Sequence, residues 1–228
     1  CHVGQHLWLD DHLSHRILRV LRWRVGKQWV MMDGKGQCAI VTVMAIRDKQ
    51  VGIEVMEIQQ IPQPSAHIAV AVPICSRQTM AQLFDQGTQM GCQAFYPTMY
   101  AHSRSTGQHK NIDAKSQQRW QTILEHAAEQ SEQAWLPGLA APMDLETLCT
   151  QTTTMQKIEL GFTEPMSPST LHTLLEQPVL LCLGPEGGLT QEESAHIRAQ
   201  GGQCLRLRGG ILRVETALVA ALATLQAS

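Results

Sequence analysis

The chain has 228 residues, of which 43% are hydrophobic and 17% charged, so it can bury a core and is not disordered in bulk. Its formal net charge is −2, which excludes an overall basic field and leaves any RNA binding to a local patch. We find no signal peptide and no apolar run long enough to span a bilayer. We therefore expect a cytoplasmic protein that does not act at a membrane.

Seven cysteines and ten histidines are scattered through the chain. None of the cysteines forms a C-x-x-C pair and the histidines show no metal-ligand spacing, so we expect no metal site. An odd number of cysteines, with Cys182 and Cys204 inside apolar runs, is typical of reduced thiols in the cytosol.

The first segment with a clear pattern is a basic helix. We expect this helix over 11–23, capped by one of the aspartates at its start. Arg16, Arg19 and Arg22 recur every third residue, which places them roughly along one side of the helix. They form either a solvated helix face or a stripe that contacts phosphates and positions RNA without reading its sequence.

Short strands follow this helix. Strands are expected at 29–32, 38–43 and 51–55, and the Asp33–Gly36 turn joins the first two as a hairpin. This pattern suggests a small barrel. Two prolines in Ile61–Pro64 favour an extended linker, so we place a domain boundary there, with domains over 1–62 and 65–228.

Beyond the linker, continuous apolar strands alternate with helices. Such alternation predicts an α/β domain with a mostly parallel sheet and helices on both faces. We expect strands at 68–74, 94–96, 158–160, 179–183 and 204–207. We expect a polar loop at 98–114, a short helix that begins at Met143, and longer helices at 80–90, 116–134, 168–176, 190–200 and 215–225.

Two glycine-centred turns, 183–189 and 208–213, each lie between an apolar strand and a helix. Strand, glycine turn and helix is the arrangement of a ligand site at the carboxyl edge of an α/β sheet. Glycines there allow a ligand to approach the backbone, although each turn alone is equally an ordinary connection. The spacing fits neither the dinucleotide nor the P-loop phosphate motif.

The pair Gly184–Leu189 and Ile211–Ala217 closely resembles motifs of the ribosomal RNA small subunit methyltransferase E family, and weaker similarity covers nearly the whole chain. That family belongs to the SPOUT, or trefoil-knot, methyltransferases. The resemblance implies a knotted C-terminal domain that binds S-adenosyl-L-methionine, methyl transfer to N3 of a uridine in 16S rRNA, and a homodimer. It also implies a PUA-like RNA-binding barrel at the N-terminus. The family has a further strand before the position of Cys1, so we expect an incomplete barrel.

The resemblance also implies roles for individual residues. Arg213 matches the family's arginine and is expected either to stabilise charge in the transition state or to bind RNA. The alternative is a surface arginine or a salt bridge to Glu215 at the start of the last helix. RNA contacts are expected at Arg16, Arg19, Arg22, Arg77 and Arg119. Cofactor contacts are expected at Leu183, Gly184, Pro185, Glu186, Gly187, Gly188, Leu207, Gly209, Gly210, Ile211 and Leu212.

Several charged residues of the family are absent from this chain. The positions concerned are Gly87, Gln89, Ala101, His102, Gln133 and Gly210. Losses of charge in loops that line an RNA cleft motivate a second hypothesis, a diverged paralogue that binds RNA or ribosomes without methylating them. A nucleotide-binding α/β enzyme of unrelated chemistry is a third hypothesis, which the missing phosphate motifs disfavour.

Overall fold

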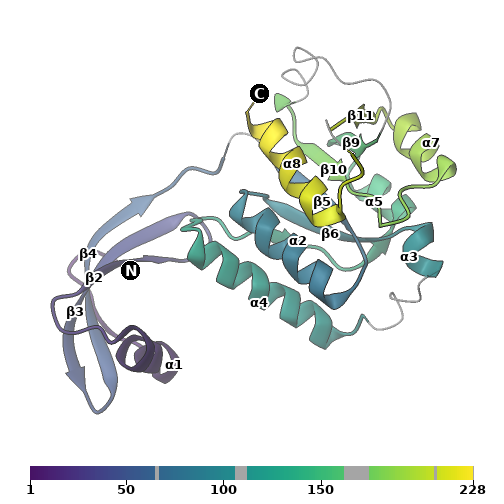
Figure 1. The fold of residues 1–228 in the computed structure, drawn as a ribbon. Helices are drawn as coiled ribbons and strands as arrows, with labels where there is room; N and C mark the ends of the chain where they lie inside the picture. Colours follow the sequence, from purple (N-terminus) through teal and green to yellow (C-terminus); the bar gives the residue numbers. More distant parts are fainter. Residues whose placement is uncertain (65–66, 106–111, 162–174, 208–209, 228) are drawn as a thin grey trace. The chain divides into compact units, whose positions relative to one another are not determined.

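A boundary between Gln63 and Pro64 divides the chain into two units, Cys1–Gln63 and Pro64–Ser228. The computed structural model describes residues 1–64, 67–105, 112–161, 175–207 and 210–227 (Figure 1). Each unit has its own sheet and its own apolar core, so each is described by itself.

The sheet of the first unit is antiparallel, with the strand order β1-β4-β3-β2. Its strands are β1 (His6–Trp8), β2 (Gln28–Met32), β3 (Gln37–Arg47) and β4 (Gln50–Gln60). The expected hairpin joins β2 and β3, where Asp33 Oδ1 accepts hydrogen bonds from the amides of Lys35 and Gln37 at 2.7 and 3.0 Å. In the described strands β1 and β2 lie at opposite edges, so this sheet is open.

The basic helix is shorter and less regular than expected. Asp10 caps α1 (Asp11–His15) by accepting from the amide of Leu13, and the chain continues as the π-helix η1 (Arg16–Leu21). Arg22 then takes a left-handed conformation with φ 53°, which ends the helix before Trp23. The three arginines therefore do not form one continuous helical stripe, because Arg22 lies past the last turn.

The second unit contains a parallel sheet with the order β11-β9-β10-β5-β6-β7, and β8 also pairs with β6. All the strand pairs in it are parallel within the described residues, which confirms the predicted α/β class. The strands are β5 (Ile68–Pro73), β6 (Ala94–Met99), β7 (Gly138–Leu139), β8 (Met143–Asp144), β9 (Gln156–Leu160), β10 (Val179–Cys182) and β11 (Gln203–Leu205).

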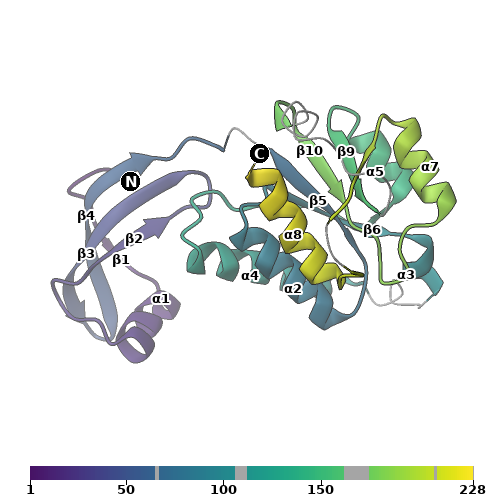
Figure 2. The same cartoon turned by 45° about the horizontal axis from the view of Figure 1, so that its top comes forward.

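Helices cover both faces of this sheet (Figures 1 and 2). Alternate residues of β5 show the division: Val70 and Val72 join a cluster with α2, α4 and α8, whereas Ala69 and Ala71 join a cluster with α5 and α7. A short helix, α3, follows β6. The helices are α2 (Arg77–Gln89), α3 (Ala101–Ser105), α4 (Ala114–Gln130), α5 (Leu145–Gln151), α7 (Gln191–Ala199) and α8 (Val214–Gln226).

Three sequence predictions in this unit are wrong in detail. The polar loop expected over 98–114 contains the helix α3 at Ala101–Ser105. Strand β6 continues through Pro97, which pairs with Val72 and lies between the residues that pair with β7 and with β8. No strand on that side needs a donor at this position, so proline is tolerated. Met143 and Asp144 form strand β8, and the Asp144 side chain then caps α5 by accepting from the amide of Thr147 at 2.8 Å. The helix expected at 168–176 falls largely outside the described residues.

Candidate functional site

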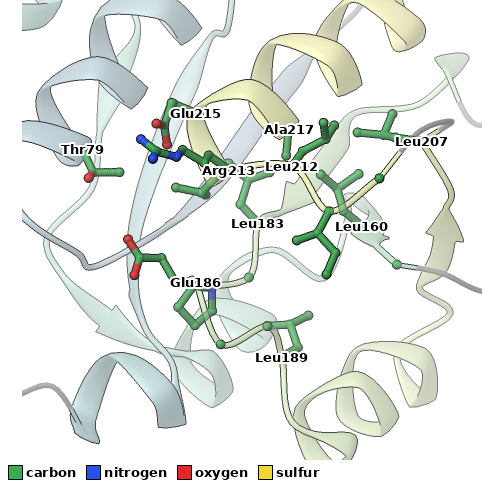
Figure 3. Close-up of a pocket in the computed structure, with 18 of the residues that line it drawn as sticks. Thr79, Leu160, Leu183, Glu186, Leu189, Leu207, Leu212, Arg213, Glu215 and Ala217 are labelled. Atoms are coloured by element: carbon green, nitrogen blue, oxygen red, sulfur yellow. The ribbon is translucent and has the colours of Figure 1, made fainter.

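A cavity of about 840 Å³ lies at the carboxyl ends of β9, β10 and β11, beside the first turns of α2 and α8 (Figure 3). Such a volume is in the range of small-molecule sites. It is lined by Gln78, Thr79, Gln82, Leu160, Gly161, Leu183, Gly184, Pro185, Glu186, Gly187, Gly188, Leu189, Leu205, Leu207, Gly210, Ile211, Leu212, Arg213, Val214, Glu215 and Ala217.

The two glycine turns meet in this cavity. Every described residue that the sequence nominated for cofactor contact lines it, together with Arg213. Gly209 lies outside the described residues. Sequence reasoning missed the contribution of β9, through Leu160 and Gly161, and that of α2, through Thr79. The contribution of β9 could have been predicted from the sequence, because Gly161 follows an apolar strand, as Gly184 does.

The first turn exposes bare backbone to the cavity. A Cβ added at Gly184 would lie 3.1 Å from the amide nitrogen of Leu189 and 3.3 Å from the carbonyl carbon of Gly188, so the two ends of the turn pack against each other. Gly188 has φ +73°, a conformation that glycine adopts without strain, and its amide donates to the Pro185 carbonyl at 2.7 Å. Glycine is therefore required at both positions by the shape of the turn.

The expected capping box holds the helix that follows this turn. Thr190 Oγ1 accepts from the amide of Glu193 at 3.1 Å, and Glu193 Oε2 accepts from the amide of Thr190 at 2.8 Å. The start of α7 is thereby fixed next to the glycine turn, since two of the amides there have side-chain acceptors.

The cavity has a polar side and an apolar side. Figure 3 shows Thr79, Glu186, Arg213 and Glu215 toward one side, and the leucines of β9 and of the second turn toward the other. Arg213 is the exposed N-terminal flanking residue of α8 and lines the cavity. The site therefore offers an apolar wall for a ring and charged groups for a polar reacting centre.

Cys75 lies close to this polar side but is not poised as a nucleophile. Burial, together with the nearby carboxylates of Glu186 and Glu215, raises the pKa of the Cys75 thiol to about 12, while a hydrogen bond with Thr79 lowers it in part. The thiol is thus protonated at neutral pH, whereas nucleophilic attack requires the thiolate.

The arginines expected to contact RNA are distributed over both units. Arg77 is the exposed first residue of α2, next to the stretch that lines the cavity, and Arg119 is half-buried on α4, which packs against α2. In the first unit, Arg19 and Arg22 are exposed, and Arg16 is half-buried.

Neither a metal cluster nor a membrane helix is found in the part of the chain that the structure describes. Its histidines, cysteines and acidic residues form no group of three or more that could hold a metal ion. No helix among these residues is both long and apolar enough to cross a membrane. All seven cysteines are free thiols.

Comparison with known proteins gives a consistent result. Residues 62–226 match the family model described as RNA methyltransferase domain. The chain is 29% identical to the ribosomal RNA small subunit methyltransferase E of Synechocystis sp., over 93% of this chain and 70% of that protein. It is 24% identical to the protein of the same name from Bacillus subtilis, over 92% of this chain and 86% of that protein.

Solved structures with the same fold cover almost the whole chain. One is a ribosomal RNA small subunit methyltransferase E from Neisseria gonorrhoeae bound to S-adenosyl methionine, with a TM-score of 0.83, 24% identity and coverage of 100% of this chain and 93% of that one. Another is a probable rRNA-methyltransferase from Porphyromonas gingivalis, with a TM-score of 0.80, 24% identity and coverage of 98% and 94%.

Proposed function

Because the chain belongs to the RNA methyltransferase domain family, we propose that it is an S-adenosyl-L-methionine-dependent enzyme that methylates N3 of a uridine in 16S rRNA. The names of the curated relatives support the small-subunit RNA as substrate, and the bound molecule of the Neisseria gonorrhoeae structure supports the cofactor. The observation that carries the proposal is the cavity in which both glycine turns meet.

The residues of the cavity fit the cofactor. Its volume suits a small molecule, and its apolar wall of Leu160, Leu207 and Leu212 suits an adenine ring. Glycine at 184 allows the two ends of the first turn to pack together, and the glycines of this turn that line the cavity present backbone without side chains to it. On this proposal the turns 183–188 and 207–212 hold the cofactor mainly through backbone groups, and Glu186 hydrogen-bonds it or orients its loop.

The chain's own residues then have to prepare the acceptor. The bound cofactor supplies a methyl group already activated on a sulfonium. Uridine N3 carries a hydrogen and is a weak nucleophile until that proton leaves. Its departure places negative charge on the ring and its two carbonyl oxygens, and a guanidinium nearby stabilises that charge. Arg213, exposed at the polar side of the cavity, is the residue assigned to this role.

The path of the chain around the cavity supports a trefoil knot in the second unit. Strand β11 lies at one edge of the sheet beyond β9, whereas α8, which follows it, packs against α2. The described part of the connection between them lines the cavity together with Gly161 and the first glycine turn. Such a return of the chain past an earlier connection is what a knotted topology requires.

The remaining parts of the proposal concern RNA and assembly. The first unit acts as a PUA-like RNA-binding domain, supported by its antiparallel strands and exposed arginines. Arg77 and Arg119 contact the same RNA. Two chains pair as a homodimer that acts in the cytoplasm, where the ribosomal substrate is found.

Three of the six lost charges give no support to a non-catalytic paralogue, whereas Gly210 lines the candidate site and His102 contacts its first turn. Gln89 and Gln133, which stand where the family has charged residues, both line a separate cavity of about 390 Å³. Gly87 is buried against Phe95, where a charged side chain could not be accommodated. These three positions are not among the residues that line the candidate site.

Titration calorimetry with S-adenosyl-L-methionine and with ATP tests the cofactor assignment. Saturable binding of the first and none of the second is the expected result. Binding of ATP alone would replace the proposal with an unrelated nucleotide-binding enzyme.

A further inference from the structure

The glycine turn at Gly184–Leu189 is contacted by a histidine of α3. The imidazole Nδ1 of His102 lies 2.8 Å from the carbonyl oxygen of Gly188. A carbonyl oxygen only accepts, so Nδ1 carries a hydrogen and donates to it. His102 is not among the residues that line the cavity, so it contacts the turn without contributing to the cavity wall.

The same imidazole occupies the space beside Gly187. A Cβ added at Gly187 would lie 2.9 Å from Nδ1 of His102 and 3.0 Å from its Cγ, closer than real Cβ atoms approach other atoms. The backbone of Gly187 has no positive φ that would exclude alanine. A larger residue at this position would have to displace the His102 side chain, because the imidazole takes the place of a side chain.

His102 is itself held in position by the start of α7. Glu193 Oε1 accepts from the amide of Ala101 at 2.7 Å, while its Oε2 accepts from the amide of Thr190. The preceding residue, Tyr100, is fully buried. The Glu193 carboxylate thus connects the start of α3 to the start of α7, the helix that follows the turn. His102 of α3 in turn contacts the turn itself.

We propose that His102 is a positioning residue that fixes the Gly184–Leu189 turn in the shape that binds the cofactor. It acts on the ligand only through the backbone of Gly187 and Gly188. The inference deepens the proposed function, because it assumes that this turn binds S-adenosyl-L-methionine.

Substitutions at His102 separate positioning from general stability. His102→Ala removes the hydrogen bond and the packing, and should weaken cofactor affinity about five- to tenfold, the scale of one lost hydrogen bond. His102→Asn places an amide N–H near the position of Nδ1 and should restore most of the affinity. His126→Ala, an exposed histidine on α4, is the matched control and should change nothing.

A double-mutant cycle gives the sharper test. Gly187→Ala alone should weaken cofactor affinity by displacing His102, but in the His102→Ala background the methyl group has room and should add little. Additive losses, or unchanged affinity in His102→Ala, would overturn the proposal.

Hydrogen exchange without cofactor distinguishes this inference from the proposed function. His102→Ala should accelerate exchange of the amides at 184–189 and leave the strands of the sheet at the parental rate. If the parent binds no S-adenosyl-L-methionine but this acceleration occurs, the proposed function fails, while the role of His102 in fixing the shape of the turn is supported. If His102→Ala leaves the exchange at 184–189 unchanged, the positioning role of His102 is refuted whether or not the cofactor binds.

Discussion

The amide nitrogen of Leu189 lies 3.1 Å from the position that a Cβ would take at Gly184. Gly184→Val should therefore force the two ends of the turn apart and weaken cofactor binding on the order of a hundredfold, or about 2.8 kcal/mol. Calorimetry measures the affinity, and circular dichroism checks that the fold is retained. Gly138→Ala is the control, because its added methyl would meet Ala94 Cβ at 3.8 Å, an ordinary contact. Parental affinity in a folded Gly184→Val protein would refute this site.

Gly87 tests whether packing outweighs helix propensity. At an exposed helix position, replacing glycine by alanine would raise the free energy of unfolding by about 1 kcal/mol. Here the added Cβ would lie 2.7 Å from Cε1 of Phe95, so we expect destabilisation by roughly 1–3 kcal/mol. Urea unfolding measures the change, and Phe95→Leu in the same chain should reduce it. A more stable Gly87→Ala variant would contradict this packing.

Arg213 should act on the rate and not on cofactor binding. Because charge develops near it only during transfer, Arg213→Ala should slow single-turnover methylation by roughly a hundredfold or more. Its cofactor affinity should stay close to the parental value. Arg206→Ala, on the neighbouring strand connection outside the cavity lining, is the control. A parental rate in Arg213→Ala would remove the catalytic role.

Arg19 should contribute to RNA affinity through phosphate contact. Arg19→Ala is expected to weaken RNA binding modestly and to lower the salt dependence by about one counterion. Arg47→Ala, an exposed arginine at the end of β3, serves as the control. Filter binding at several salt concentrations measures both quantities. An unchanged salt slope in Arg19→Ala would show that this arginine is only a solvated side chain.

Helix α8 predicts the oligomeric state. It buries Leu218, Ala221, Leu222 and Leu225 within its own chain, yet leaves the apolar Ala220 and Ala223 only partly covered or exposed. A helix that is apolar on several sides needs a second partner surface. We expect light scattering at micromolar concentration to give twice the chain mass. The mass of a single chain under these conditions would contradict the homodimer.

The sequence predicted the parts of the fold that depend on local chemistry. The hairpin at Asp33, the capping box at Thr190 and the apolar strands of the parallel sheet were all found where the residues indicated. What failed depended on distant partners. Strand β1 has three exposed residues and exists because β4 pairs with it, and Pro97 is tolerated in β6 because of where β7 and β8 pair.

The candidate site was predictable to the same extent. Glycines that follow apolar strands indicated both turns, because a turn depends on residues that are neighbours in the sequence. The roles of Thr79 and His102 were not predictable, because α2 and α3 reach the site only through the topology of the sheet. Gln89 and Gln133, which stand where the family has charged residues, line a separate cavity. Their grouping could not be predicted either, because they come from segments far apart in the sequence.

Methylation of authentic small ribosomal particles tests the central claim most directly. Particles from a strain lacking this protein are incubated with the protein and S-adenosyl-L-methionine, and the 16S rRNA is digested and analysed by mass spectrometry. The account predicts one new methyl group, on N3 of a uridine, and none when Arg213→Ala is used for the same short time. Unmethylated RNA in the presence of a protein that binds the cofactor would contradict the enzyme assignment and favour a non-catalytic paralogue.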